Sequence, residues 1–405
     1  MKPLAILCFA LFLCTPSQAQ SVTLSQLFAF PCQSTTPYFC VDGAKPVALI
    51  QASDGNFYGV TETSYASHSN TVHLAGGTIF KITPSGTLTV LYTFKQNTKT
   101  GYYDQGSIPN ALAEGSDGYL YGTAGGGGPN AASAGTLFKI AKSGSGFQVI
   151  ETYCTTCVTG GFPDNIVAGS DGNLYGTTSA GGTYTCQGLG CGVVFKLTTT
   201  GTYTVLHSLN GTTDTQSPNG VIQASDGKLY GTTASTYTGT IFRVDPTTGQ
   251  FTTIYNFPTA NHSLDVATQA SNGLLYGASR LTNNTGPITV YSSTLAGSVH
   301  DLVTISFGSA KKIGIGPFLQ ASDGNLWSTS NSGGTSYYGA VFAVSTSGTV
   351  VQDLSLDGTK GAYPVAGVLQ TTNGTIYVSM TDRGTDSQGN AAYGTIATLT
   401  GLPPR

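Results

Sequence analysis

The chain has 405 residues, of which only 9% are Asp, Glu, Lys or Arg, and its formal net charge is −3. So slight a charge excludes the electrostatic attraction that draws proteins to nucleic acid or to anionic membrane surfaces. The 55 Gly and only 2 Met, with Thr and Tyr abundant, favour β-structure with many turns.

The first element is a predicted secretory signal peptide over residues 1–19. Lys2 supplies a positive start, Leu4–Leu13 is an apolar run, and small residues lead to a cleavage point after Ala19. A lipoprotein reading would use Cys14, but the bulky leucine before it does not fit. No later segment is long and apolar enough to predict a membrane span.

One phrase then recurs along the chain, first as QASDGNFYG at 51–59. Each copy belongs to a unit of four short apolar runs rich in Val, Ile, Thr, Tyr and Phe, which predict β-strands. Units of about 50 residues with four strands each indicate a β-propeller. The Gly of each Asp-Gly or Asn-Gly step stands at 55, 118, 172, 227, 273, 324 and 374. Seven copies predict an all-β, seven-bladed propeller with four antiparallel strands per blade.

The expected blades form a single domain over 20–405. The last unit ends at 394–400 without a fourth run, whereas residues 22–30 (VTLSQLFAF) match the fourth-run phrase TVLYTF. We therefore expect 22–30 to pair in the last blade and close the ring. The predicted blades are 46–94, 109–153, 163–209, 218–257, 264–307, 315–356 and 364–400 plus 22–30.

Six cysteines remain after the expected cleavage, in three couples that are local in sequence: Cys32 and Cys40, Cys154 and Cys157, Cys186 and Cys191. In an exported protein an even count favours disulfides. The CxxC spacing of the second couple leaves metal binding open as an alternative, and free or mixed thiols are another. The favoured interpretation has no metal and no cofactor.

The repeated phrase itself predicts a turn rather than a site. Asp-Gly between two strands is typical of a type I′ hairpin, in which both central residues have positive φ. Asn272 and Asn373 replace the acid in two copies, which preserves a turn and discards a charge. The aromatic residue that follows (Tyr58 in the first copy, Trp327 in the sixth) is expected to pack between blades.

These phrases resemble the GloVer-type tandem repeat of exported bacterial proteins. The matching residues are LFAF at 27–30, QASDGNFYG at 51–59, GGTIFKIT at 76–83 and LYTF at 91–94, with counterparts down the chain. The resemblance implies export and a propeller-like repeat, and it implies no defined activity. The final LPPR departs from the surface anchors of that family. DGNLW (Asp323–Trp327) is also similar to blades of streptogramin lyases, and the double glycines are similar to kelch repeats.

Long connections are expected on one face only, because alternate turns of an antiparallel blade emerge on the same side. All six cysteines lie in those connections. Rigid scaffolds carry function on such loops, and Tyr with acids suits sugars or peptides. The candidate ligand-binding residues are Tyr102, Tyr103, Asp104, Tyr337, Tyr338, Asp382 and Arg383.

The predicted function is a monomeric, exported binding scaffold for an extracellular glycan or peptide. No GxSxG, HExxH, P-loop or dinucleotide-binding motif occurs in the sequence, so it assigns no catalytic residues. The alternative is a carbohydrate-active or lyase-type propeller, for which His68, His73, Asp104 and Asp382 are the candidates. A purely structural envelope or surface repeat is the third reading.

Overall fold

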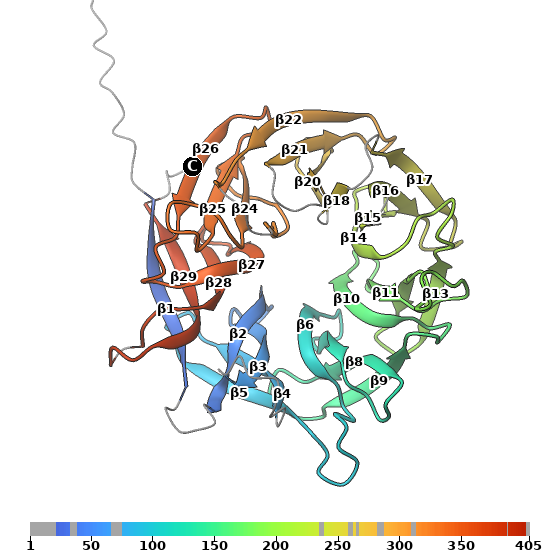
Figure 1. The fold of residues 1–405 in the computed structure, drawn as a ribbon, viewed down its shortest axis with the longest axis horizontal. Coiled ribbons are helices and arrows are strands. Elements are labelled where there is room, and N and C mark those ends of the chain that lie inside the picture. Colours follow the sequence, from blue (N-terminus) through green and yellow to red (C-terminus); the bar gives the residue numbers. More distant parts are fainter. Residues whose placement is uncertain are drawn as a thin grey trace, which may run out of the picture.

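Seven β-sheets stand around a central opening (Figure 1). The computed structural model describes residues 22–32, 39–65, 75–234, 239–257, 262–264, 267–281, 287–308, 313–386 and 388–401. Those residues contain strands and turns and no helix, so no membrane-spanning helix is found among them. The predicted all-β, seven-bladed propeller is confirmed.

Each blade is an antiparallel sheet whose strands run from the centre outward in chain order. Blade one holds β2 (Phe39–Gln51), β3 (Phe57–Tyr65), β4 (Ala75–Ile82) and β5 (Leu88–Lys95). Blade two holds β6 (Ser107–Glu114), β7 (Leu120–Gly126), β8 (Ser133–Ile140) and β9 (Gln148–Cys154). Blade three holds β10 (Gly161–Ala168), β11 (Leu174–Ala180), β12 (Val193–Leu197) and β13 (Tyr203–Ser208). Blade four holds β14 (Pro218–Gln223), β15 (Leu229–Ala234), β16 (Gly239–Val244) and β17 (Phe251–Asn256).

The remaining blades keep the same order with local changes. In blade five the innermost position is shared by β18 (His262–Leu264) and β19 (Thr268–Gln269), followed by β20 (Leu275–Leu281), β21 (Ile288–Ser293) and β22 (Val299–Ile305). Blade six holds β23 (Leu319–Gln320), β24 (Leu326–Ser330), β25 (Ala340–Val344) and β26 (Val350–Ser355). Blade seven holds β27 (Ala362–Gln370), β28 (Ile376–Asp382), β29 (Ala392–Thr400) and, outermost, β1 (Thr23–Pro31).

The N-terminal strand closes the ring as expected. β1 pairs antiparallel with β29, from Thr23 opposite Thr400 to Pro31 opposite Ala392. Phe30 is fully buried against the aromatic core that blades seven and one share. Because the two ends of the chain form one sheet, the last blade has the same four strands as the others.

The hydrophobic core lies mainly in the seams between neighbouring blades. The cluster between blades one and two, for example, joins Tyr58 and Phe94 to Leu112 and Phe138. Within the first five sheets the Gly of the Leu-Tyr-Gly phrase makes room for an aromatic ring of the next strand. A Cβ on Gly122 would lie 2.4 Å from Phe138 Cζ, which no real contact allows. The Leu-Tyr-Gly phrase of the second strand therefore packs against the aromatic residue in the phrase of the third strand.

The expected type I′ turn is wrong. Gly55 has φ +78°, but Asp54 is not among the non-glycine residues with positive φ. Gly55 N–H donates to Ala52 O, and Ala52 N–H donates to Asn56 O, each at 2.9 Å. The loop thus has three residues with Gly in the left-handed region, a common three-residue hairpin.

The Asp of the repeated phrase contributes through the hydrogen bonds of its carboxylate. Asp54 Oδ1 accepts the Asn56 N–H at 3.1 Å, and Oδ2 accepts the Tyr58 hydroxyl at 2.8 Å. Tyr58 is fully buried, so its hydroxyl needs such a partner. In the sixth copy Trp327 Nε1 donates to Asp323 Oδ2 at 3.0 Å. The expected packing of these aromatic residues between blades is confirmed.

A repeated glutamine ties the hairpins of several blades to the next blade. Gln223 Nε2 donates to Gly227 O in its own hairpin at 3.0 Å, and its Oε1 accepts the Ser170 N–H of the previous blade at 2.6 Å. We call this pair of bonds the glutamine latch. The same interblade bond reaches Gln269, Gln320 and Gln370, and Glu114 takes the place of glutamine in blade two. Blade three has Ala168 at this position.

Candidate functional site

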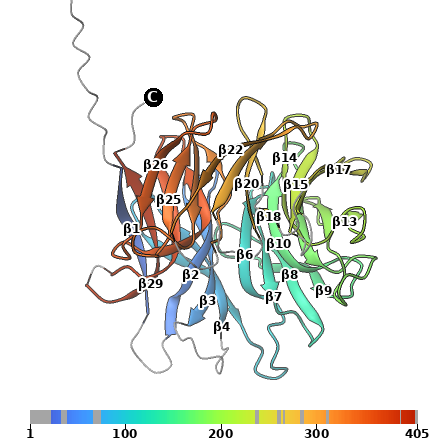
Figure 2. The ribbon, with the colours of Figure 1, turned by 45° about the horizontal axis from the view of Figure 1, so that its top comes forward.

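The long connections gather on one face of the ring, which we call the rim. It consists of the second-to-third and fourth-to-first strand connections, together with the first residues of the innermost strands; Figure 2 shows the ring in an oblique view. The opposite face carries the hairpins of the glutamine latches. The cysteines form disulfides as expected, and the pairing, which the sequence left open, is Cys32–Cys40, Cys154–Cys157 and Cys186–Cys191, all on the rim. Because these six sulfur atoms are bonded in pairs, none of them is a thiolate that could bind a metal.

A four-residue corner recurs where the rim enters the innermost strand. The corner has the same pattern in five blades: its first and third residues have positive φ, its second can be any residue, and its fourth is Pro. The third position holds a different side chain in each blade, and we call it the presented residue. The corners are Gly43–Pro46, Gly106–Pro109, Gly160–Pro163, Thr215–Pro218 and Gly361–Pro364, with presented residues Lys45, Ile108, Phe162, Ser217 and Tyr363.

The presented residues adopt a backbone that suits glycine. Their φ values lie between +52° and +58°. For a β-branched or bulky side chain such a φ is an outlier that costs about 1–3 kcal/mol. Ile108 is nevertheless retained with 49% of its surface exposed, and Phe162 with 38%. Exposed apolar side chains on a strained backbone are of little use to folding, so they point to contact with something outside the chain.

All the strained positions share this face. Among the described residues nine non-glycine residues have positive φ: Lys45, Ile108, Phe162, Gln187, Thr215, Ser217, Tyr337, Tyr363 and Arg383. Each lies in a rim connection or at the start of an innermost strand. None of them lies in the hairpins of the other face. Strain of this kind concentrates at binding and catalytic sites.

Buried threonines of the third strands hold the corners in place. The Thr78 hydroxyl donates to Asp42 O at 3.3 Å, Thr136 to Gln105 O at 3.1 Å, and Thr395 to Lys360 O at 2.7 Å. Each of these carbonyls stands three residues before a presented residue. The repeated Gly-Thr of the third strand therefore fixes the backbone of the rim.

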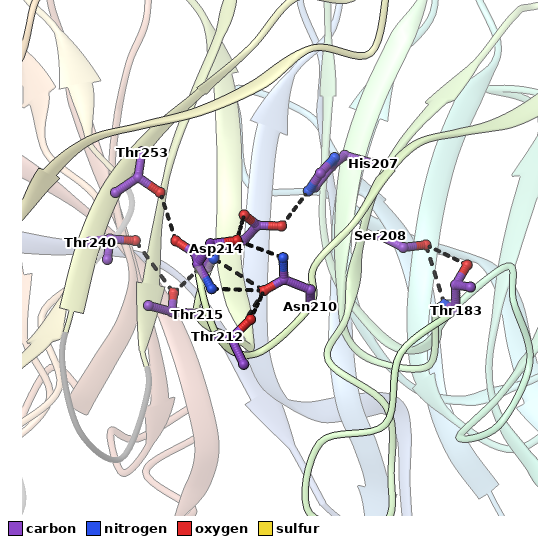
Figure 3. A network of polar contacts seen from close by, with 10 residues as sticks. Thr183, His207, Ser208, Asn210, Thr212, Asp214, Thr215, Thr240 and Thr253 are labelled. Carbon is purple, nitrogen blue, oxygen red and sulfur yellow. Dashed lines mark hydrogen bonds and ion pairs between the residues drawn. The ribbon is translucent and has the colours of Figure 1, made fainter.

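Blade four uses a more extensive polar network for the same purpose (Figure 3). Asn210 Oδ1 accepts the N–H groups of Thr212 at 2.8 Å and Thr213 at 2.9 Å. Thr215, at the first position of the corner, donates its hydroxyl to Thr233 at 2.7 Å. His207 Nε2 lies 2.8 Å from Asp214 Oδ2. The connection is thus ordered up to Ser217.

The structure separates the three predicted ligand-binding groups into two places. Tyr102, Tyr103 and Asp104 lie in the connection between β5 and β6. Asp104 accepts bonds from Asn97 Nδ2 at 2.5 Å and from the Thr100 hydroxyl at 3.3 Å, so its carboxylate is used to shape its own loop. Tyr102 is 38% exposed, and Tyr103 is half-buried.

The other two predicted groups meet at the seam between blades six and seven. The Arg383 guanidinium lies 4.1 Å from the centre of the Tyr338 ring. Tyr363, which the sequence pattern did not single out, meets the same ring edge-on at 5.9 Å. Asp382 Oδ1 accepts the Arg383 N–H at 2.8 Å, and Tyr337 is 52% exposed. This Tyr–Arg cluster is the largest group of predicted site residues that the fold brings together.

One carboxyl group that sequence reasoning missed stands in the innermost strand of blade three. Asp164 follows the corner of Phe162 and is exposed, yet protein surrounds it closely enough that burial raises its pKa to about 7. A hydrogen bond from Ser179 opposes that rise. Asp164 can therefore exchange a proton near neutral pH.

Two of the candidates for the enzyme alternative are histidines. His68 and His73 lie outside the described residues. His207 and His300 lie on the outer strands β13 and β22. Within the described ranges no three His, Cys, Asp or Glu side chains are grouped as a metal site would require.

The sequence matches the Gloeobacter/Verrucomicrobia repeat over three overlapping stretches, 10–238, 108–312 and 217–400. The chain belongs to this repeat family. For this Gloeobacter/Verrucomicrobia repeat protein the overlapping matches reflect the tandem blades. No curated protein matches the sequence.

Several solved structures are similar to the repeat protein in fold. A catalytically inactive variant of virginiamycin B lyase from Staphylococcus aureus, solved with quinupristin, is 14% identical, with a TM-score of 0.58 over 94% of this chain and 100% of the lyase. A Bacteroides fragilis protein assigned as a 6-phosphogluconolactonase is 15% identical, with a TM-score of 0.52 over 84% and 89% of the two chains. The extracellular domain of a hybrid two-component system from B. thetaiotaomicron is 13% identical, with a TM-score of 0.55 over 89% of this chain and 40% of that one. At these identities the likeness concerns the fold alone.

Proposed function

We propose that the protein is an exported binding scaffold that holds a glycan or peptide ligand on the rim. The observation that carries the proposal is the concentration of strained, non-glycine residues on one face. The positive φ values and the Pro recur in each corner, whereas the presented side chain differs from blade to blade. A constant frame with variable side chains is the arrangement of a recognition surface.

The chemistry of the rim agrees with this reading. Exposed Tyr102, Ile108, Phe162 and Tyr337 supply flat or apolar contact area. Aromatic rings of this kind stack on sugar rings and on peptide side chains. The disulfides and the export of the repeat family support a location outside the cytoplasm.

The test is a glycan and peptide array probed with the chain without residues 1–19. Tyr102→Ala and Tyr337→Ala change the rim, and Tyr119→Ala is the matched control, because Tyr119 is 39% exposed in a hairpin of the other face. We expect binding that at least one rim variant weakens and the control keeps. Binding that survives both rim changes, or that the control loses equally, would contradict the proposal.

A second candidate is a lyase-type or carbohydrate-active enzyme, which the exposed Asp164 favours. Its pKa near 7 suits a general acid or base. The expected result is turnover of an array ligand by the natural chain and its loss in Asp164→Asn, with binding retained. Array ligands that are bound and recovered intact would leave the scaffold reading alone.

A further inference from the structure

The Tyr–Arg cluster holds a guanidinium group in a fixed position. Arg383 stacks on the face of Tyr338, and Tyr363 meets that ring at an interplanar angle of 85°. Gly358 provides the seat, since a Cβ there would lie 3.1 Å from both Arg383 Cδ and the Tyr338 ring. Arg383 itself has φ +64°. Stacking occupies the face of the guanidinium and leaves the N–H donors along its edge.

Neighbouring carboxylates do not use those donors. Asp357 Oδ1 accepts the Thr359 N–H at 2.8 Å and the Thr359 hydroxyl at 2.7 Å. Asp386 accepts bonds from Asn390, and Asp382 takes the backbone N–H of Arg383. In the part of the chain that the structure describes, the Arg383 side chain forms no ion pair. Asp382 and Asp386, which flank Arg383 in sequence, and Asp357, which precedes Gly358, are thus engaged elsewhere.

We infer that Arg383 binds a carboxylate group of the ligand. A guanidinium edge offers two parallel N–H donors that match the two oxygens of a carboxylate. The Tyr338 stack pre-orders the group, so less conformational entropy is lost on binding. The inference rests on the proposed function and refines it, because it specifies an acidic ligand. The same carboxylate chemistry occurs in uronic acid sugars and at peptide C-termini.

The low number of arginines makes a direct test possible. The whole chain has four, Arg243, Arg280, Arg383 and Arg405. NMR of the arginine Nε–Hε groups therefore gives few signals, and Arg383→Gln identifies the relevant one. D-glucuronate and N-acetylglycine represent the two sources of carboxylate, with D-glucose and N-acetylglycinamide as neutral controls. We expect a saturable shift of the Arg383 signal with at least one acid at concentrations on the order of 10 mM, and none with its neutral control.

Two variants separate charge from geometry. Arg383→Lys keeps the charge and loses the paired donors, so binding of the acid should weaken about tenfold. Tyr338→Phe keeps the ring beneath the guanidinium and should bind as the natural chain does. Equal shifts of Arg243 and Arg280, equal binding by Arg383→Lys, or no saturable shift at all would overturn the inference. Array binding of a neutral ligand that Arg383→Gln leaves unchanged would reject the carboxylate while the proposed function stands.

Discussion

Gln223 accepts the Ser170 N–H at 2.6 Å and so connects the innermost strand of blade four to the hairpin of blade three. The bond crosses 53 residues of sequence and one seam of the ring. Together with its bond to Gly227 O, it satisfies both ends of one amide. Repetition of this contact around the ring suggests that the latches, besides the apolar seams, hold neighbouring blades in register.

The two seams that flank blade three allow a matched pair of latch variants, since Gln223 meets blade three from blade four and Ala168 faces blade two. Gln223→Ala leaves the Ser170 N–H without its acceptor and should lower the free energy of unfolding by about 1–2 kcal/mol. Ala168→Gln places an amide where Ser116 N–H of the previous blade can reach it, and should raise that free energy by about 0.5–1 kcal/mol. Urea unfolding measures both. A destabilised Ala168→Gln protein would show that the missing latch is not simply an absent side chain.

Removal of β1 should weaken the entire ring. A chain that begins at Asp42 lacks the strand opposite β29 and the buried Phe30, whose burial alone contributes about 2–3 kcal/mol. We expect a clearly lower midpoint of thermal unfolding. The control is the full-length Cys32→Ser, Cys40→Ser double variant, which loses the disulfide and keeps the strand. Equal melting of the shortened chain and this control would rule out closure as a source of stability.

The carboxyl group of Asp164 should make stability depend on pH. Burial raises its pKa to about 7, so between about pH 4 and about pH 7 the folded protein holds a proton that the unfolded chain has released. Stability contributed by this group is therefore lost as the pH rises through that window. Asp164→Asn should remove the slope and be the more stable protein at about pH 8. Asp301→Asn, on the exposed outer strand β22, is the control for general charge effects in urea unfolding.

A presented residue should be needed for binding and not for folding. Ile108→Gly relieves the positive φ and should change the free energy of unfolding by less than about 1 kcal/mol, in the stabilising direction. Its affinity for an array ligand should fall. Gly106→Ala provides the contrast, since its Cβ would lie 2.3 Å from the Thr136 hydroxyl oxygen and should destabilise the corner. A large loss of stability in Ile108→Gly would assign the side chain to the fold instead.

The blade count and the closure of the ring could be predicted because each depends on local pattern. The Asp-Gly phrase marks every hairpin, and the absent fourth strand of the last unit leaves one place for residues 22–30. The turn type was wrong because the Asp54 carboxylate binds the Asn56 N–H and the Tyr58 hydroxyl, a demand that the dipeptide alone does not show.

The latch and the corner escaped prediction for different reasons. Gln223 looks like an ordinary strand residue, since its partner stands one blade earlier. The presented residues share no side-chain chemistry. What recurs is the Pro directly after each of them and the residue of positive φ two places before. Their variation hid the corner and is also what supports the proposed recognition surface. Of the predicted site residues, Tyr338 and Arg383 came together because blades six and seven are neighbours, whereas Asp104 turned inward to its own loop.

The pairing of Thr23 with Thr400 also imposes an order in time. β1 is among the first strands to be synthesised and cannot find its place until β29, the last, is available. Closing so large a loop is slow. A chain interrupted before β29 leaves an unpaired strand edge that can pair with other chains. The ring can therefore close only after β29 has been synthesised, so the pairing of β1 with β29 requires synthesis of every blade between them.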